Sequence, residues 1–324
     1  MEDINIFVLD SIYPGVDFTV PEFERLRSIA PNLKFHIVPK TNLTDEMADL
    51  ADIFYGCVPV AFLPRCKKLK WLHLASAGAA EYCDPSLYQN PDCLLTNSSG
   101  VFGIPIAEHV MALLLGLTRR VDEFVRQGQQ PLWKNCQPLR DICGSTVGIL
   151  GYGDIGSQVA RRLQGFMCKK IVGVRRHPGA CPPELDALYG MDALDEVIAS
   201  SDILIICLPG TKDTYHLLDA KRLGSMKEGS FLINIGRGSI VDQEALIDAL
   251  QNGPLAGAGL DVVTPEPLPA DSPLWKMQNV IISSHSSGGS PHNPVRSFAI
   301  FERNLKHYLA GEPMENQVDF NLQY

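Results

Sequence analysis

Short apolar runs alternate with helix-like stretches through the middle of the chain, from about residue 146 to residue 285. Strands that alternate with helices are typical of βαβ units, in which the strands pair in parallel. The pattern therefore predicts a parallel sheet with helices on its faces. The predicted strands are residues 146–150, 170–174, 203–208, 231–235, 256–262 and 280–284.

One connecting segment of this block carries helix signals at both ends. Asp242 is a good N-cap residue, and Gly253 stands where a glycine is expected after a helix C-terminus. The apolar residues between them fall on one helical face: Ala245, Leu246, Ala249 and Leu250. A helix is predicted between the two signals.

A second alternating region precedes this block, with predicted strands at residues 4–9, 34–38, 53–55, 71–74 and 94–96. After the block, residues 297–309 have the spacing of an amphipathic helix, which Gly311-Glu312-Pro313 ends. The chain therefore predicts an α/β fold with two Rossmann-like or flavodoxin-like domains built on parallel sheets. Residues 106–289 are expected to form a dinucleotide-binding domain, inserted into a substrate domain made of residues 1–105 and 290–324.

The charge balance argues against a polyanionic ligand. The 324 residues carry a formal net charge of -9, whereas nucleic-acid binding depends on basic patches. The first residues have no basic segment and no cleavage site of a signal peptide, and no apolar stretch approaches the roughly 20 residues of a membrane-spanning helix. We expect a protein that binds neither nucleic acid nor a membrane.

The nine cysteines are scattered singly, without a C-x-x-C pair. Such spacing does not indicate a zinc or redox motif, so no metal site is predicted. Free thiols are typical of reducing compartments. We therefore expect a cytoplasmic protein.

A glycine-rich loop directly follows the first strand of the middle block. Its sequence is Gly151-Tyr152-Gly153-Asp154-Ile155-Gly156, and it opens a predicted helix. In a dinucleotide-binding loop the first glycine makes the tight turn, the second lets the backbone approach a pyrophosphate, and the third allows helix and strand to pack. The helix N-terminus then faces the anion. The loop predicts a dinucleotide site.

The end of the next strand bears on which dinucleotide binds. A site for NAD places an acidic residue about 20 positions after the loop, where it binds the ribose 2′-hydroxyl. Here that place holds Arg175-Arg176-His177. Because guanidinium groups pair with phosphate through forked donors, we predict a preference for NADP(H), with NAD(H) as a possible second cofactor. The alternative is a solvated basic turn that leaves NAD usable.

Arg237 lies between two glycines just past the predicted strand 231–235. Ligands of open α/β sheets bind at the carboxyl ends of strands, and the flanking glycines suggest close backbone approach rather than packing. An arginine at this place can clamp a substrate carboxylate and polarise the neighbouring carbonyl. An interdomain salt bridge is the alternative.

The next two strand ends carry acidic residues and a histidine. Asp261 ends one strand and is followed by Glu266, and His285 ends the next strand. A histidine hydrogen-bonded to a carboxylate is held in one tautomer, and its protonated form is favoured, as a general acid requires. His285 alone could equally be structural, but with Arg237 and Glu266 it predicts a catalytic set.

Several segments form a recognisable series along the chain: residues 97–100, 107–109, 144–151, 208–211, 234–238, 259–262, 266–269 and 284–285. In this order they resemble the D-isomer-specific 2-hydroxyacid dehydrogenases, which include glyoxylate/hydroxypyruvate reductases and phosphoglycerate dehydrogenase. The resemblance covers nearly the whole chain. It implies NAD(P)H-dependent reduction of a small 2-oxo acid to the D-2-hydroxy acid, as in glyoxylate/hydroxypyruvate reductases.

The resemblance also implies roles for individual residues. Arg237 is expected to bind the carboxylate and carbonyl of the substrate, His285 to donate the proton, and Glu266 to hydrogen-bond His285. Asp261 is expected to orient the nicotinamide carboxamide. The residues expected to contact the cofactor are Gly151, Gly153, Asp154, Ile155, Gly156, Arg175, Arg176, Leu208, Pro209, Thr214, Ile235, Asp261 and His285.

Further implied sites lie outside the glycine-loop block. Backbone amides around Ser76, Ala77 and Gly78 are expected to hold the substrate carboxylate, which suits a nest of small residues. The helix 106–117 and the arm after it are expected to build a homodimer. Trp133 is expected to reach the active site of the partner or to anchor the interface.

Some positions depart from the family pattern. Residues 286–289 read Ser-Ser-Gly-Gly where isoleucine, glycine, serine and alanine are usual, and Val263-Thr264 replaces a frequent phenylalanine-glutamate pair. These changes concern the nicotinamide wall and the substrate pocket. A phosphoglycerate dehydrogenase-like enzyme and an NAD(P)-sensing scaffold or corepressor on the same fold stay open as alternatives. A formate dehydrogenase is disfavoured because glutamine is expected there in place of Glu266.

Overall fold

The computed structural model describes residues 2–9 and 20–323. The chain divides into two compact units. Unit 1 runs to Val101 and resumes at Ser290, and unit 2 is Phe102–Gly289. The first boundary lies four residues before the predicted position, because the first helix of unit 2 already begins at Gly103. The predicted fold of two parallel α/β domains is confirmed.

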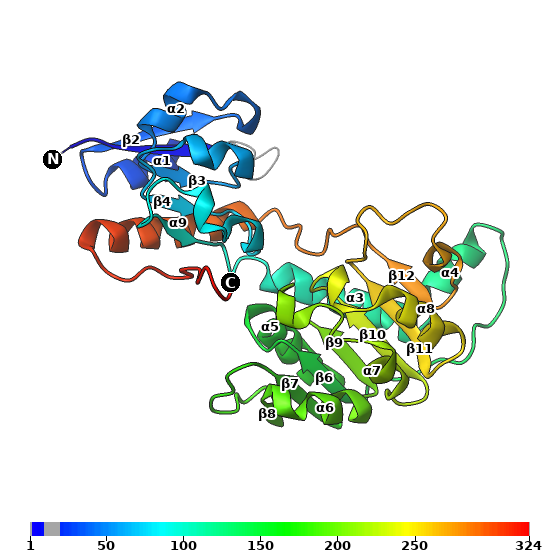
Figure 1. Ribbon diagram of the computed structural model, residues 1–324. Helices are drawn as coiled ribbons and strands as arrows, with labels where there is room; N and C mark the ends of the chain where they lie inside the picture. Colours follow the sequence, from blue (N-terminus) through cyan, green and yellow to red (C-terminus); the bar gives the residue numbers. More distant parts are fainter. Residues whose placement is uncertain (1, 10–19, 324) are drawn as a thin grey trace. The chain divides into compact units, whose positions relative to one another are not determined.

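Unit 1 contains a five-stranded parallel sheet in the order β2-β1-β3-β4-β5 (Figure 1). This is the order of flavodoxin-like sheets. Apolar residues of the short strands are buried on both sides, which favours parallel pairing under helices. The strands are β1 (Ile4–Leu9), β2 (Leu33–Val38), β3 (Ile53–Tyr55), β4 (Trp71–His73) and β5 (Leu94–Thr96).

Two short helices and one long helix accompany this sheet: α1 (Val20–Arg27), α2 (Asp45–Leu50) and α9 (Asn293–Ala310). The ring of Phe301 on α9 stacks on Tyr55 of β3 and on Trp71 of β4. The helix α9 therefore packs against one face of the sheet of unit 1. The helix begins four residues before the predicted start. It ends as predicted at Gly311, whose φ of 68° is the left-handed conformation that glycine adopts freely.

Unit 2 contains a seven-stranded parallel sheet in the order β12-β11-β10-β9-β6-β7-β8. The strand order reverses between β6 and β9, which creates a switch point of the Rossmann kind. The edge strand β8 was not predicted; its apolar run, Ala187-Leu188-Tyr189, has only three residues, all partly exposed. The strands are β6 (Thr146–Leu150), β7 (Lys170–Val174), β8 (Ala187–Tyr189), β9 (Ile203–Ile206), β10 (Ser230–Asn234), β11 (Leu255–Leu260) and β12 (Val280–Ile282).

Helices cover both faces of this sheet (Figure 1). One face packs against α3 (Gly103–Thr118) and α5 (Asp154–Leu163). The other packs against α6 (Leu194–Ser200), α7 (Ala220–Gly224) and α8 (Gln243–Gln251). Among the described residues, no helix combines the length and the apolar character that crossing a membrane requires.

The helix predicted from its two end signals is α8. Asp242 caps it by accepting hydrogen bonds from the backbone of Glu244 and Ala245. Gly253 follows the helix, but not as a left-handed cap. A side chain there would meet the backbone of Ala249 at 2.8 Å, so close packing against the last turn explains the glycine.

Candidate active site

The glycine-rich loop follows β6 at the switch point of the sheet of unit 2. Gly151 has a φ of 95°, and a Cβ there would lie 2.7 Å from the backbone of Cys207 after β9. A Cβ on Gly156 would lie 2.5 Å from the carbonyl oxygen of Gly151. The first and third glycines therefore let two strand ends and the helix α5 meet, as the fingerprint predicts.

The second glycine of the loop faces open space. A Cβ on Gly153 would have no neighbour within 4 Å. In the first turn of α5, the backbone N–H groups of Ile155 and Gly156 have no backbone acceptor among the residues of unit 2. An open glycine beside free N–H groups at a helix N-terminus fits the pyrophosphate of a dinucleotide.

Asp154 lies within the loop, but its side chain points elsewhere. Its carboxylate lies against the start of α3, 2.6 Å from where a Cβ of Gly103 would be. A carboxylate is favourable near a helix N-terminus. The side chain of Asp154 thus ties α5 to α3.

The loop after β9 is held by one threonine. The buried Thr214 hydroxyl donates to the carbonyl of Pro209 at 2.8 Å and accepts from the backbone N–H of Thr211 at 2.8 Å. Leu208 is half-buried and Pro209 is exposed. Thr214 was predicted to contact the cofactor, but its hydroxyl bonds the backbone of its own loop. These bonds stabilise the loop.

Arg175 and Arg176 follow β7 and are exposed. The guanidinium of Arg176 pairs with the carboxylate of Asp213 at 2.9 Å. Asp213 belongs to the turn Lys212–Thr214 after β9. Sequence reasoning missed Asp213, because a lone acidic residue in a turn has no local signature and its partner is 37 positions away.

Arg237 follows β10 in a loop that is packed between its neighbours. A Cβ on Gly236 would lie 2.5 Å from the carbonyl oxygen of Leu208, and one on Gly238 would lie 1.9 Å from that of Val263. Packing against the loops after β9 and β11 therefore requires both glycines, and the prediction that they do not serve packing was wrong. Gly210 also leaves room for the stem of Arg237, whose Cγ would lie 2.8 Å from a Cβ there.

The guanidinium of Arg237 is exposed and available. Its Nη1 donates to the carbonyl of Gly236 at 2.7 Å. Within unit 2, all of whose residues are described, no carboxylate lies within ion-pair distance of it. The remaining donors of the fork can therefore bind a carboxylate from outside the unit.

His285 and Glu266 are brought together at the ends of β12 and β11. The Nδ1 atom of His285 lies 2.9 Å from Oε2 of Glu266. The other carboxylate oxygen of Glu266 accepts from the backbone N–H of Val263 at 3.2 Å. A carboxylate only accepts, so Nδ1 carries a hydrogen, and the open nitrogen Nε2 is the one that can exchange a proton with a ligand.

Asp261 shapes the turn that carries His285. His285 has a φ of 51°, and its backbone N–H donates to the carbonyl of Asp261 at 2.8 Å. The buried carboxylate accepts from the Ser283 hydroxyl at 2.6 Å and from the backbone N–H groups of Ser286 at 3.0 Å and Ser287 at 3.1 Å. These bonds hold an uncommon backbone conformation in place.

The pKa of Asp261 reflects the same contacts. Burial raises the pKa of this carboxyl, but the hydrogen bonds from Ser283, Ser286 and Ser287 outweigh it and hold the pKa below its usual value. Asp261 is therefore ionised in the folded protein at neutral pH. Its charge fastens the His285 turn, in addition to any bond with a nicotinamide carboxamide.

His109 on α3 extends this network and was predicted only as part of a family motif. Its Nε2 lies 2.8 Å from the hydroxyl of Ser283. Because that hydroxyl donates to Asp261, it accepts from Nε2–H of His109. The sequence shows that Ser283 lies two residues before His285, and this was the only local signal of the network. The bond between Ser283 and His109 on α3 joins residues 174 positions apart, so the sequence did not indicate it.

Ser76, Ala77 and Gly78 lie in unit 1, after β4, and form a loop with free backbone donors. Their carbonyls are engaged: that of Ser76 by the N–H of Ser98 at 2.9 Å, that of Ala77 by Nδ2 of Asn97 at 2.8 Å, and that of Gly78 by the Ser76 hydroxyl at 2.8 Å. Their own N–H groups have no backbone acceptor among the described residues. Such a loop can bind an anion.

A buried chain of hydroxyls supports this loop. Tyr55 Oη lies 2.8 Å from Ser297 Oγ, which lies 2.9 Å from Ser98 Oγ. The Ser98 hydroxyl donates to the carbonyl of Leu74 at 2.8 Å. Since each hydroxyl has one hydrogen, Ser297 donates to Ser98 and Tyr55 donates to Ser297. The chain links α9 to the two strand ends that carry the loop.

His73 completes the network and is held neutral. The indole N–H of Trp71 donates to the Thr96 hydroxyl at 2.8 Å, and that hydroxyl lies 2.7 Å from His73 Nδ1. The hydrogen of Thr96 therefore goes to Nδ1, and the ring hydrogen is on Nε2, facing Ser98 at 3.5 Å. Burial lowers the pKa of His73 to about 3.

Acid should weaken unit 1 through His73. Below pH 6.5, the ordinary pKa of histidine, His73 binds a proton in the unfolded chain but not in the folded chain. The free energy of unfolding therefore decreases as the pH is lowered, until about pH 3. At pH 5 the expected loss is about 2 kcal/mol. Urea unfolding at pH 7.5 and 5.0 measures it by the fluorescence of Trp71, after Trp133 and Trp275 are replaced by phenylalanine.

The variant His73→Gln is the control, since glutamine does not titrate in this range. Its stability should fall less between the two pH values, by about the amount assigned to His73. Equal losses in both proteins would show that His73 takes up a proton in the folded state.

Comparison with known proteins places this chain in a family. A sequence model of the NAD binding domain of D-isomer specific 2-hydroxyacid dehydrogenases matches residues 111–287. The chain belongs to the D-isomer specific 2-hydroxyacid dehydrogenase family. The resemblance noted in the sequence is confirmed, and the protein is a nicotinamide-dependent oxidoreductase of 2-oxo or 2-hydroxy acids.

Relatives cover most of the chain. Glyoxylate/hydroxypyruvate reductase B of Pectobacterium carotovorum is 35% identical over 269 residues, which are 82% of this chain and 83% of the relative. Glyoxylate reductase of Korarchaeum cryptofilum is 37% identical over 69% of each chain. A D-isomer specific 2-hydroxyacid dehydrogenase of Xanthobacter autotrophicus, crystallised with NADPH and MES, is 30% identical and aligns over the whole of both chains with a TM-score of 0.82.

Proposed function

We propose that this protein reduces a small 2-oxo acid, such as glyoxylate or hydroxypyruvate, to the D-2-hydroxy acid with NADPH. The observation that carries this is the His285–Glu266 hydrogen bond of 2.9 Å, at strand ends adjacent to that of Arg237. A histidine oriented by a carboxylate, together with an arginine that has no ion pair within unit 2, suits reduction of a carbonyl next to a carboxylate. The names of the two reductase relatives support the choice of substrate.

Each residue of the proposed site has its own role in the reaction. A nicotinamide dinucleotide held at the glycine-rich loop 151–156 would supply the hydride for the carbonyl carbon. Arg237 binds the substrate carboxylate and stabilises negative charge on the carbonyl oxygen. His285 donates the proton from Nε2 to that oxygen, and Glu266 orients the ring through its bond to Nδ1. The N–H groups of Ser76, Ala77 and Gly78 are proposed to bind the substrate carboxylate.

The residues after β7 support the proposed preference for NADPH. Arg175 and Arg176 are exposed there, and no acidic residue occupies the position that binds a ribose 2′-hydroxyl in NAD enzymes. Guanidinium groups suit a 2′-phosphate. The NADPH-bound relative from Xanthobacter autotrophicus supports the same cofactor.

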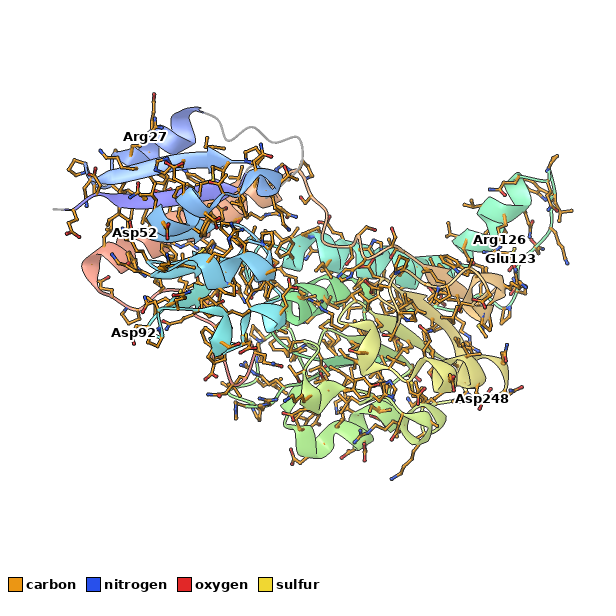
Figure 2. All side chains as sticks on the ribbon, turned by 45° about the horizontal axis from the view of Figure 1, so that its top comes forward. Arg27, Asp52, Asp92, Glu123, Arg126 and Asp248 are labelled. Carbon is orange, nitrogen blue, oxygen red and sulfur yellow. The ribbon has the colours of Figure 1, made fainter. Side chains whose placement is uncertain are left out.

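We further propose a cytoplasmic homodimer built on α3 and on α4 (Val121–Gly128) with the arm that follows it. Val121, Phe124 and Val125 of α4 are exposed, and Trp133 in the arm is completely exposed. Arg126 of the same helix, labelled in Figure 2, donates to the carbonyl of Gln278 at 3.4 Å. A helix that exposes its apolar side suits contact with a second copy.

Initial rates of NADPH and NADH oxidation with a panel of 2-oxo acids test the proposed function. The panel is glyoxylate, hydroxypyruvate, pyruvate, 2-oxoglutarate and phosphohydroxypyruvate. We expect turnover of glyoxylate or hydroxypyruvate, faster with NADPH than with NADH at equal concentrations. Selective turnover of phosphohydroxypyruvate would instead indicate a phosphoglycerate dehydrogenase-like enzyme. Tight cofactor binding without turnover of any acid would favour a sensing scaffold.

A further inference from the structure

An ion pair crosses the end of the sheet where the cofactor loop lies. Arg176 follows β7 and Asp213 follows β9, and β6 with the glycine-rich loop is the strand between them. Nη2 of Arg176 lies 2.9 Å from Oδ2 of Asp213. The pair therefore lies on the side of the sheet where a dinucleotide fits.

The two arginines after β7 are not equivalent. Within unit 2, which is described in full, Arg175 has no carboxylate within ion-pair distance. Arg176 has Asp213, which is fixed in a short turn. The turn is closed by a capping box in which Thr211 and Thr214 each bond the backbone of the other. Asp213 thus stands at a defined place, with 77% of its side chain exposed.

We propose that Asp213 is a specificity-determining residue that limits the preference for a 2′-phosphorylated cofactor. Its carboxylate neutralises one of the two guanidinium groups and repels a phosphate that binds beside them. The same carboxylate can accept a hydrogen bond from an unphosphorylated ribose hydroxyl. Asp213 therefore keeps NADH usable at a site whose arginines favour NADPH. This role rests on the proposed function, since it requires a nicotinamide dinucleotide at the glycine-rich loop.

Binding of the two cofactors to Asp213→Asn tests the role directly. Asparagine retains the size of the side chain and removes its charge. The ratio of the dissociation constants, NADH over NADPH, should rise about three- to fivefold, mainly because NADPH binds more tightly. Titration followed by nicotinamide fluorescence gives both constants without turnover. The increase should shrink in 0.5 M salt, where exposed charges are screened.

Asp141→Asn is the matched control. Asp141 pairs with Arg119 at 2.8 Å and is likewise 77% exposed, but it precedes β6, whereas the cofactor loop follows that strand. The ratio should stay unchanged in this variant. An equal rise in both variants would show an effect of net charge alone and overturn the assignment.

The remaining outcomes separate the two claims. If Asp213→Asn leaves the ratio unchanged or lowers it while the wild type binds both cofactors, Asp213 does not limit the preference and the proposed function stands. A lowered ratio would show that Asp213 orients Arg176 toward the phosphate. If the wild type binds neither NADPH nor NADH, both the proposed function and the role of Asp213 are overturned.

Discussion

Replacing His285 with alanine should lower kcat for 2-oxo acid reduction by about 10²- to 10⁴-fold, the range of a lost general acid. Nε2 of His285 is the nitrogen left open by the bond to Glu266. Without it, the alkoxide that forms as the carbonyl is reduced has no positioned proton donor. The dissociation constant for NADPH should change little, because the glycine-rich loop is untouched. Steady-state rates and cofactor titration measure the two quantities separately.

His216 offers a matched control for this variant. It also has a positive φ, of 47°, and a carboxylate near its ring, with Nδ1 lying 3.9 Å from Asp242. His216→Ala should lose far less than tenfold in kcat. Near-normal turnover by His285→Ala at neutral pH, with the acid and NADPH both saturating, would show that another group donates the proton.

Arg237→Ala should lower kcat/KM by about 10²- to 10³-fold, the size of the effect when one donor to a developing oxyanion is lost. Both KM and kcat should worsen, because the guanidinium is proposed to bind the carboxylate before reaction and to stabilise the carbonyl oxygen during it. Rates over a wide range of substrate concentration separate the two effects. The stability of the fold should change little, since Arg237 is exposed and has no ion pair within unit 2.

Arg237→Lys and chemical rescue serve as controls. Lysine retains the charge but lacks the forked donors, so this variant should lie between the wild type and Arg237→Ala. Added guanidinium ion at millimolar concentration should partly restore kcat in Arg237→Ala. A rise in KM alone would limit Arg237 to substrate binding and argue against its role at the carbonyl oxygen.

Much of the architecture was predictable because it is encoded locally. Buried parallel strands appear as apolar runs, and each predicted run overlaps a strand of the structure. Some predicted strands were too long. The strand predicted at residues 203–208 ends at Ile206 in the structure, and Leu208 lies in the following loop. The edge strand β8 was missed, because its apolar run is only three residues long and all three residues are partly exposed.

The sequence predicted which residues of the candidate site stand at the ends of strands. In a parallel sheet all carboxyl ends share one edge, so Arg237, Asp261 and His285 had to lie at the same edge once their strands were recognised. The side-chain contacts were not predictable. Asp213 and His109 are bound to residues 37 and 174 positions away, and no local pattern marks either pair.

The sequence by itself determined the two parallel α/β domains, the glycines that the cofactor loop requires, and which side chains stand at strand ends. Each of these depends on the spacing of residues within one short segment. Only the tertiary structure decided that Asp261 stabilises the turn of His285, that Glu266 bonds Nδ1 rather than Nε2 of His285, and that Asp213 pairs with Arg176. Those contacts depend on strand order and loop packing, which bring distant segments together and which no single segment encodes.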